Sequence, residues 1–413
     1  MPSLLFTRRR RWPRRLLKTT GIVLLAAVAV VILSIAINRF DESIEPSTQA
    51  WLDYPAPTVP EAQNGYLALM ALDAQVANPI VAAAGVVREE RAIFADARKS
   101  HQYAEPRYQQ VRARLLRPRT VRIALDDCQH DCYAYILSHA QLLAQLSGTH
   151  ADLLQRYGAM LDFPAYAEDI PRDPAALYPN HELASRLDLL YLGNVVAALQ
   201  QGDAQAAYRQ WARHRRFWQM AAAGSVTLRD TLRAIARLER SQALLSGMLT
   251  AHPESAAAAR LHALPVLAAR PRLAPLVARS MVIEFQMQAY VVTDMIAHAS
   301  LFAIGEIQPA GLGDRLALLF YQRNASLNLL HRLHQSDLLQ NGVALDGKIA
   351  SSDADARIKG PCAYQLDWHL LSNPLGRHLL CKEGSYDLRR YHERAARADQ
   401  ATKELELSIQ AVR

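Results

Sequence analysis

The sequence is poor in glycine, with 17 glycines among 413 residues, and poor in aromatic residues, which make up 7% of the chain. All-β folds depend on glycine-containing turns and on β-branched or aromatic runs, so this composition argues against them. Alanine and leucine are abundant instead, and both favour helices. We therefore expect an all-α fold.

Motifs that identify common enzyme families are also missing. The sequence contains no G-x-x-x-x-G-K-[ST] phosphate loop, no H-E-x-x-H zinc motif, no G-x-S-x-G nucleophile elbow and no G-x-G-x-x-G dinucleotide loop. The usual grounds for assigning an activity are therefore absent, and we expect no cofactor.

Charged residues are lacking between Thr19 and Asn38, and Gly21–Ile37 is almost wholly apolar. An apolar helix of about 20 residues spans the ~30 Å hydrocarbon core of a bilayer. The preceding residues 1–18 contain seven arginines and lysines and no acid, and such basic flanks stay cytoplasmic. We predict a basic cytoplasmic tail over 1–18, one transmembrane helix over 19–38, and export of the rest.

A cleaved signal peptide is the alternative to a retained anchor. Residues 34–36 (Ser-Ile-Ala) fit a small-x-small cleavage site, although the apolar run exceeds the usual h-region of about 7–15 residues. The pair Arg14 and Arg15 also resembles part of a twin-arginine export signal. All three interpretations export the main domain. We expect a single-pass protein of the inner (cytoplasmic) membrane in a Gram-negative type of envelope, with a periplasmic main domain.

The formal charge of +8 suggests a nucleic-acid partner, but its distribution argues against one. Seven of the 47 basic residues lie in residues 1–18, which leaves 40 basic against 39 acidic residues in the remainder. The exported part thus lacks the positive field that a nucleic-acid binder uses. The expected partners are the lipid bilayer, through residues 19–38, and a protein of the envelope.

The four cysteines are Cys128, Cys132, Cys362 and Cys381. An even number in an oxidising compartment suggests disulfides, and four cysteines permit three pairings. We favour Cys128–Cys132 and Cys362–Cys381 because each closes a short loop, the second contributing about 3 kcal/mol. The alternative is a metal site at Cys128, His130 and Cys132, although their spacing matches no standard zinc motif.

The exported part divides at its prolines. Residues 39–60 contain four prolines and are predicted to be an extended spacer. A helical subdomain follows over 61–252, and four further prolines between Pro253 and Pro275 mark the start of a second helical subdomain over 253–413. The order of helices and short turns indicates antiparallel helical hairpins, and it faintly resembles an α-solenoid.

The clearest helix signals lie between residues 180 and 250. Asn180 is a predicted N-cap, Gly202 a helix stop and Asp203 the next N-cap. Thr227 and Asp230 resemble a capping box at the start of a third helix.

Two helical faces are distinctive. In 204–218 the tryptophans Trp211 and Trp218 fall on an apolar stripe, whereas Arg209, Arg213 and Arg216 form another face, either simply solvated or suited to an anionic ligand. The final helix, 385–409, carries apolar residues at heptad spacing. We expect it to pack on the protein's own body rather than form a coiled-coil dimer, because two alanines and a threonine make a poor seam.

Candidate catalytic residues are Glu284, Asp294 and His298 in an apolar helix. Asp294 and His298 are four residues apart and share a helical face, and a carboxylate that orients a histidine can make a general base. No serine or cysteine nucleophile accompanies them, and hydrogen bonds between packed helices explain such residues more often than catalysis does. His331 and His334 could likewise share a metal, but two ligands do not make a site.

The leading hypothesis is a non-enzymatic interaction or scaffold protein of the envelope that uses helical hairpins as a docking surface. The alternative is an envelope hydrolase whose carboxylate and histidine site lies in residues 281–298.

Overall fold

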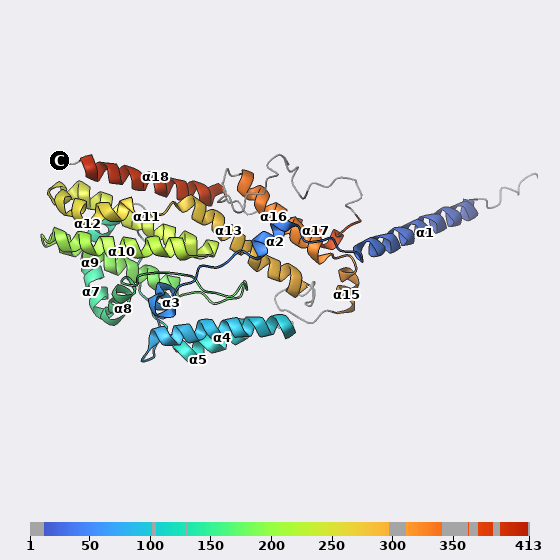
Figure 1. Cartoon of the computed structure of the whole chain (residues 1–413), viewed down its shortest axis with the longest axis horizontal. Helices are drawn as coiled ribbons and strands as arrows, with labels where there is room; N and C mark the ends of the chain where they lie inside the picture. Colours follow the sequence, from blue (N-terminus) through green and yellow to red (C-terminus); the bar gives the residue numbers. More distant parts are fainter. Residues whose placement is uncertain are drawn as a thin grey trace, which may run out of the picture.

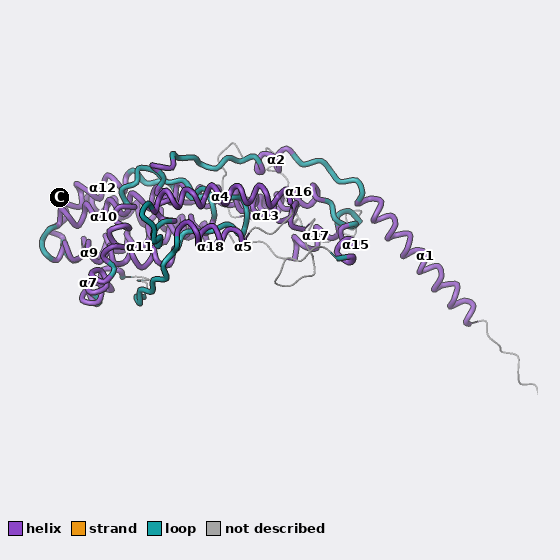
Figure 2. The backbone as a smooth tube through the Cα atoms, turned by 90° about the horizontal axis from the view of Figure 1, so that it is seen from below, coloured by secondary structure: helices purple, strands orange, loops and turns teal. Residues whose placement is uncertain are grey.

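The computed structural model describes residues 12–100, 105–126, 128, 131–296, 311–340, 362, 371–382 and 389–411. Within these ranges the ordered elements are helices, and the β pairing is limited to one isolated bridge between Asn64 and Ala165. Figure 1 and Figure 2 show an elongated body of packed helices from which a single helix projects. The predicted all-α fold is confirmed.

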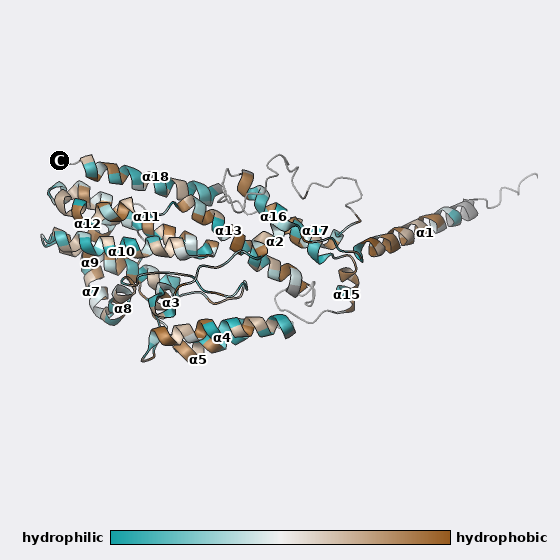
Figure 3. Cartoon of the chain, in the orientation of Figure 1, coloured by the Kyte–Doolittle hydropathy of each residue, from teal (hydrophilic) through white to brown (hydrophobic). Residues whose placement is uncertain are grey.

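The projecting helix is α1, Trp12–Asn38. Its segment Lys18–Asn38 has a mean hydropathy of 2.9 and is long and apolar enough to cross a membrane, and only 6% of it is buried against the rest of the chain. Figure 3 shows this helix, mostly in the brown of hydrophobic residues, standing clear of the body. Only its last turns touch the body, where Ser34 and Asn38 are buried.

Residues after α1 do not form a purely extended spacer. Pro46–Leu52 forms helix α2, with proline at a first-turn position where a helix needs no N–H donor. Its Trp51 is 1% exposed and packs edge-on against Phe285 and His331. The side-chain amide of Gln286 donates to the Trp51 carbonyl at 2.8 Å. Part of the predicted spacer therefore belongs to the folded body.

The centre of the body is a layer of long helices: α9 (His181–Gln200), α10 (Ala204–Gly224) and α11 (Leu228–Ala251). The predicted caps are confirmed, since Asn180 accepts from the Leu183 amide and Asp203 from the Ala206 amide. Gly202 has φ +84, the left-handed conformation that glycine adopts without strain. The short turns make these helices antiparallel neighbours, as predicted.

The start of α11 differs from the predicted capping box. The Thr227 hydroxyl does accept from the Asp230 amide at 3.3 Å, but the returning carboxylate is Glu168. It accepts from the amides of Val226 and Thr227 at 2.6 and 2.9 Å. A residue from a distant, earlier part of the chain has taken the place of the local partner, and the Asp230 carboxylate lies 2.9 Å from His181 instead.

A glycine makes this arrangement possible. The Glu168 amide donates to the Gly224 carbonyl at 3.0 Å, which brings the 165–168 segment against the end of α10. A Cβ at Gly224 would overlap the backbone of Tyr166. Glycine is therefore required there for the close approach of the two backbones.

Further helices surround this layer. In Figure 1, α4 and α5 form a separate pair below the α9–α12 layer, while α16 and α17 lie toward α1. No sequence pattern predicted α5 or the proline-containing α12. The remaining helices are α3 (Gly65–Met70), α4 (Pro79–Ser100), α5 (Glu105–Leu116), α6 (Cys132–Ser138), α7 (Ala140–Thr149), α8 (Ala151–Met160), α12 (Ala256–Ala268), α13 (Leu273–Tyr290), α15 (Leu312–Leu318), α16 (Arg323–Gln340), α17 (Pro374–Lys382) and α18 (Arg389–Ala411).

Two hydrophobic cores hold the described body together. The larger is built around α9, α10 and α11, and the smaller surrounds Trp51 between α2, α13 and α16. Helix α13 contributes to both, with Val277 in the first and Phe285 in the second. It therefore ties the two ends of the body into one packed unit.

The heptad stripe of α18 packs on the body, as predicted. Ala395, Thr402 and Ile409 are buried, and α18 contacts α11, α12 and α13. In a solenoid each repeat contacts its neighbours along the chain. The return of the last helix across three earlier ones departs from that pattern.

Candidate functional site

The structure describes one of the three predicted catalytic side chains. Glu284 is half-buried on α13 and accepts from the Leu228 amide at 3.1 Å, at the start of α11. Burial raises its pKa. Asp294 lies in the π-helical segment Val291–Met295, but its side chain and the whole of His298 lie outside the described residues. The proposed triad stays a prediction, and the contact seen for Glu284 is a helix cap.

The predicted cysteine pairing is confirmed. Disulfides join Cys128 to Cys132 and Cys362 to Cys381, with Cα separations of 5.1 and 5.6 Å. A disulfide sulfur is not the thiolate that a zinc site uses. His130, the third residue of the alternative metal site, lies outside the described residues.

His331 and His334 face the smaller core. His331 packs against Trp51 and Phe285, and His334 Nε2 lies 3.1 Å from the amide oxygen of Gln288. Burial lowers the pKa of each to about 4, so both are neutral at pH 7. The described residues near them include no cluster of three metal-ligating side chains, and their contacts are those of packed core residues.

The aromatic and basic stretch on α10 separates into two faces, as predicted. Trp211 and Trp218 are buried, whereas Arg209 and Arg216 are exposed. Arg213 forms an ion pair with Asp162. The basic face is therefore open to solvent, and one of its three cations is already paired.

A buried polar network that the sequence did not reveal centres on Asp188 of α9. Tyr157 donates to one carboxylate oxygen at 2.8 Å, and the same oxygen contacts His214 Nε2. Arg240 donates to the other at 2.6 Å. Burial alone would raise the pKa of Asp188, but His214 and Arg240 hold it well below its usual range.

This network resembles a catalytic cluster in its residue types but not in its position. Asp188 and His214 are both 0% exposed, so no substrate reaches them without opening the helix layer. The Trp218 indole donates to Tyr157 at 3.1 Å, which closes the cluster on another side. We assign it the structural role of joining α8, α9, α10 and α11.

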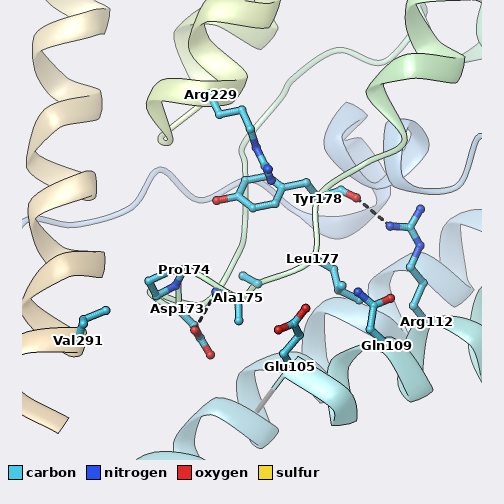
Figure 4. Close-up of a pocket in the computed structure, with 11 residues that line it drawn as sticks. Glu105, Gln109, Arg112, Asp173, Pro174, Ala175, Leu177, Tyr178, Arg229 and Val291 are labelled. Carbon is cyan, nitrogen blue, oxygen red and sulfur yellow. Dashed lines mark hydrogen bonds between the residues drawn. The ribbon is translucent and has the colours of Figure 1, made fainter. Parts of the chain in front are cut away.

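A cavity lies between α5 and the 173–178 segment. It has a volume of about 540 Å³ and is walled by Glu105 and Arg112 of α5, by Asp173 and Tyr178, and by Arg229 of α11. Figure 4 shows the Arg229 guanidinium stacked on the Tyr178 ring, and Arg112 reaching the Tyr178 carbonyl at 2.8 Å. These five side chains come from three separate parts of the chain.

The buried acid of this cavity is already engaged. Asp173 accepts from the Tyr108 hydroxyl and the Ala175 amide at 2.8 and 2.9 Å. Burial raises its pKa. Glu90, wholly buried on α4, is near the cavity-lining residues Arg112 and Asp173, which both act on its pKa.

Glu90 is a strongly perturbed acid next to this cavity. Neither of its carboxylate oxygens has a hydrogen bond of good geometry among the described residues. Burial raises its pKa to about 8, although Arg112 and the Leu177 amide act in the opposite direction. It is therefore mainly protonated at pH 7.

A second cavity of about 450 Å³ lies on the other side of Arg112, which lines both. Four arginines and two acids contribute to its walls, and we call it the arginine cavity. They are Arg112, Arg119, Arg122, Arg186, Asp73 and Glu182. Excess positive charge in a concave site suits an anionic ligand, because the low-dielectric walls strengthen each interaction.

The arginines of this cavity are not equally available. Arg112 is 3.4 Å from Asp73, and Arg119 forms an ion pair with Asp152. Arg122 is exposed, and it has no hydrogen bond or ion pair with the described residues. One cation at the cavity wall is thus open to a ligand.

No protein-family model, curated protein or solved structure matches this chain.

Proposed function

We propose that this protein is a single-pass, membrane-anchored docking protein of the envelope. Its N-terminus is cytoplasmic, its helical body is periplasmic, and the arginine cavity binds an acidic segment of a partner protein. The observation that carries the proposal is the cavity itself, where four arginines outnumber two acids around about 450 Å³.

The chemistry of the cavity favours an extended acidic segment. Arg122 is exposed in the wall of the cavity and has no ion pair with any residue that the structure describes, and guanidinium groups bind carboxylates in a two-pronged geometry. Asp73 is buried, and its carboxylate already accepts from Arg112 and Asn180 at 3.4 and 3.1 Å. The carboxylates of an acidic segment therefore bind the arginines of the cavity.

The proposed location has two supports. Seven basic residues and no acid precede the apolar helix, which favours a cytoplasmic N-terminus. All four cysteines are paired in disulfides, and disulfides persist in oxidising compartments such as the periplasm.

An envelope hydrolase acting through Glu284, Asp294 and His298 is less well supported. Glu284 is half-buried and accepts the Leu228 amide, so its carboxylate is occupied in holding the start of α11.

Binding of a fluorescent oligoglutamate peptide to the full chain in detergent tests the proposal. Arg122→Glu replaces the positive side chain with a negative one. We expect it to weaken binding about tenfold, because repulsion of the acidic ligand lowers the binding free energy by at least ~1.4 kcal/mol. The matched control is Arg209→Glu, an equal charge change on an exposed arginine of α10.

Fluorescence anisotropy measures both variants at the same ionic strength. An affinity that falls equally in both variants would show general charge attraction, and it would count against the cavity. The absence of measurable binding by the unaltered chain at physiological salt would reject the acidic ligand.

A further inference from the structure

Helix α15 presents a leucine stripe to solvent. Leu312 and Leu316 are 76% and 55% exposed, and Leu319, just beyond the helix, is 44% exposed. Their spacing of four and three residues places them on one helical face. Single exposed leucines are ordinary, but a run on one face marks an interaction surface.

The stripe lies at the base of α1. Both Figure 1 and Figure 2 show α15 next to the point where α1 leaves the body. The contacts agree, because Gln322, three residues after Leu319, donates to the carbonyls of Ile37 and Phe40 at 3.2 and 2.8 Å. Phe40 is itself 80% exposed. We call Phe40, Leu312, Leu316 and Leu319 the juxtamembrane patch.

The end of α1 is fixed to the body, so the patch keeps its place beside the apolar helix. The Asn38 amide donates to the Leu371 carbonyl at 2.6 Å, and its oxygen accepts from the Asn373 amide at 2.7 Å. The Ser34 hydroxyl donates to the same Leu371 carbonyl at 3.2 Å, one turn earlier on α1. One turn rises ~5 Å, so this edge of the body reaches the last turn of the apolar segment.

Cations border the patch. Arg39 follows the apolar run directly, and Arg315 lies on α15 between Leu312 and Leu316; both are exposed. Arginine side chains at the edge of an apolar surface reach up to lipid phosphates while their stems stay in the apolar layer. Apolar residues flanked by cations are the pattern of a surface that lies in the headgroup region.

We propose that the juxtamembrane patch lies in the headgroup region of the bilayer that α1 crosses, so that α15 is a second membrane contact of this chain. The occupant is lipid rather than another protein, because the patch continues the apolar surface of α1 and shares its fixed base. The inference rests on the membrane insertion of α1, and its experiment tests the two separately.

Single-cysteine labelling tests it directly, since all four native cysteines are in disulfides. Leu316→Cys carries an environment-sensitive fluorophore in the full chain, reconstituted in phosphatidylcholine and phosphatidylglycerol nanodiscs. Leu25→Cys on α1 is the positive control. Leu261→Cys, 61% exposed on α12, is the matched negative control.

Lipids with a quencher near the headgroup or near the end of the acyl chain report the depth of each label. We expect position 316 to emit at shorter wavelength than position 261 and to be quenched mainly by the headgroup-proximal quencher. Position 25 is expected to be quenched mainly by the deep quencher.

The outcomes separate the two claims. Quenching at 25 but not at 316 would overturn the contact of α15 with lipid and leave the anchor in place. No quenching at 25 would overturn the anchor and, with it, this inference. Emission at 316 that is shifted but insensitive to both quenchers would indicate a protein partner or a second copy on the patch, and would also overturn it.

Discussion

At the scale of single residues, buried charge decides what each group can do. Asp188 is ionised because His214 and Arg240 surround it, so it joins helices but has no access to a substrate. Glu90 has the opposite environment: burial dominates, and its pKa rises to about 8. A buried carboxyl group is thus held charged at Asp188 and neutral at Glu90.

Glu90 makes the stability of the body depend on pH. An acid whose folded pKa is raised binds its proton more tightly when folded, so its contribution is present at low pH and is lost as pH rises toward 8. Glu90→Gln keeps a neutral side chain at every pH. We expect the unaltered chain to lose about 1 kcal/mol per pH unit relative to Glu90→Gln between pH 5 and 8.

Chemical denaturation at several pH values measures this difference. Glu89→Gln is the control, because Glu89 is a neighbour on α4 whose side chain is 43% exposed. Other buried groups titrate in the same range. The quantity to compare is therefore the difference in unfolding free energy between the variants at each pH. Parallel pH profiles for the unaltered chain and Glu90→Gln would contradict the assignment.

At the scale of elements, α2 shows how a short segment becomes part of a core. A seven-residue helix is unstable alone, and here Trp51 holds it by packing on Phe285 and His331. Gln286 caps its end by donating to the carbonyls of Trp51, Leu52 and Tyr54. The smaller core is therefore assembled around a side chain from the segment that follows α1.

Trp51→Ala is expected to destabilise the body by about 3–5 kcal/mol, because it removes a fully buried aromatic side chain and leaves a cavity. Leu261→Ala, at an exposed position of α12, is expected to change the free energy of unfolding by less than about 0.5 kcal/mol. Guanidinium unfolding in detergent compares the two. Equal, small effects would mean that α2 is not an integral part of the core.

Sequence patterns predicted the elements whose signals are local. Asn180, Gly202 and Asp203 stand at helix ends, and Gly21–Ile37 is one uninterrupted apolar run. Helix α5 was missed, because Glu105–Leu116 is short, carries three arginines and has a proline as its second residue. The proline-rich 39–60 segment was predicted to be extended, but part of it forms α2. That helix depends on the tertiary packing of Trp51, which the local sequence pattern does not reveal.

The candidate site could not be predicted, because its walls come from distant segments. Asp73 follows α3, Arg112 lies on α5, Arg122 lies after α5 and Arg186 lies on α9, and these residues meet only in the folded chain. The Asp188 network likewise joins side chains from four helices. No spacing rule relates such residues, so local patterns reveal their types but not their proximity in the fold.

At the scale of the whole molecule, the distribution of charge sets the expected orientation. Basic residues in the short N-terminal flank oppose translocation, whereas the near-neutral remainder does not. A C-terminal alkaline phosphatase fusion, expressed in a Gram-negative host, is expected to be active, and a C-terminal green fluorescent protein fusion is expected to be dark when exported by the general secretory route. The reversed pattern would place the body in the cytoplasm.

The fixed base of α1 also limits how far the body can reach. A flexible tether of about 20 residues would let a domain wander roughly 25 Å from its anchor. Here Asn38 and Gln322 hold the end of α1 against the body, so that freedom is lost. In the proposed function, the arginine cavity is therefore held at one height above the bilayer and moves only in the plane of the membrane. The proposed partner would have to present its acidic segment at that height.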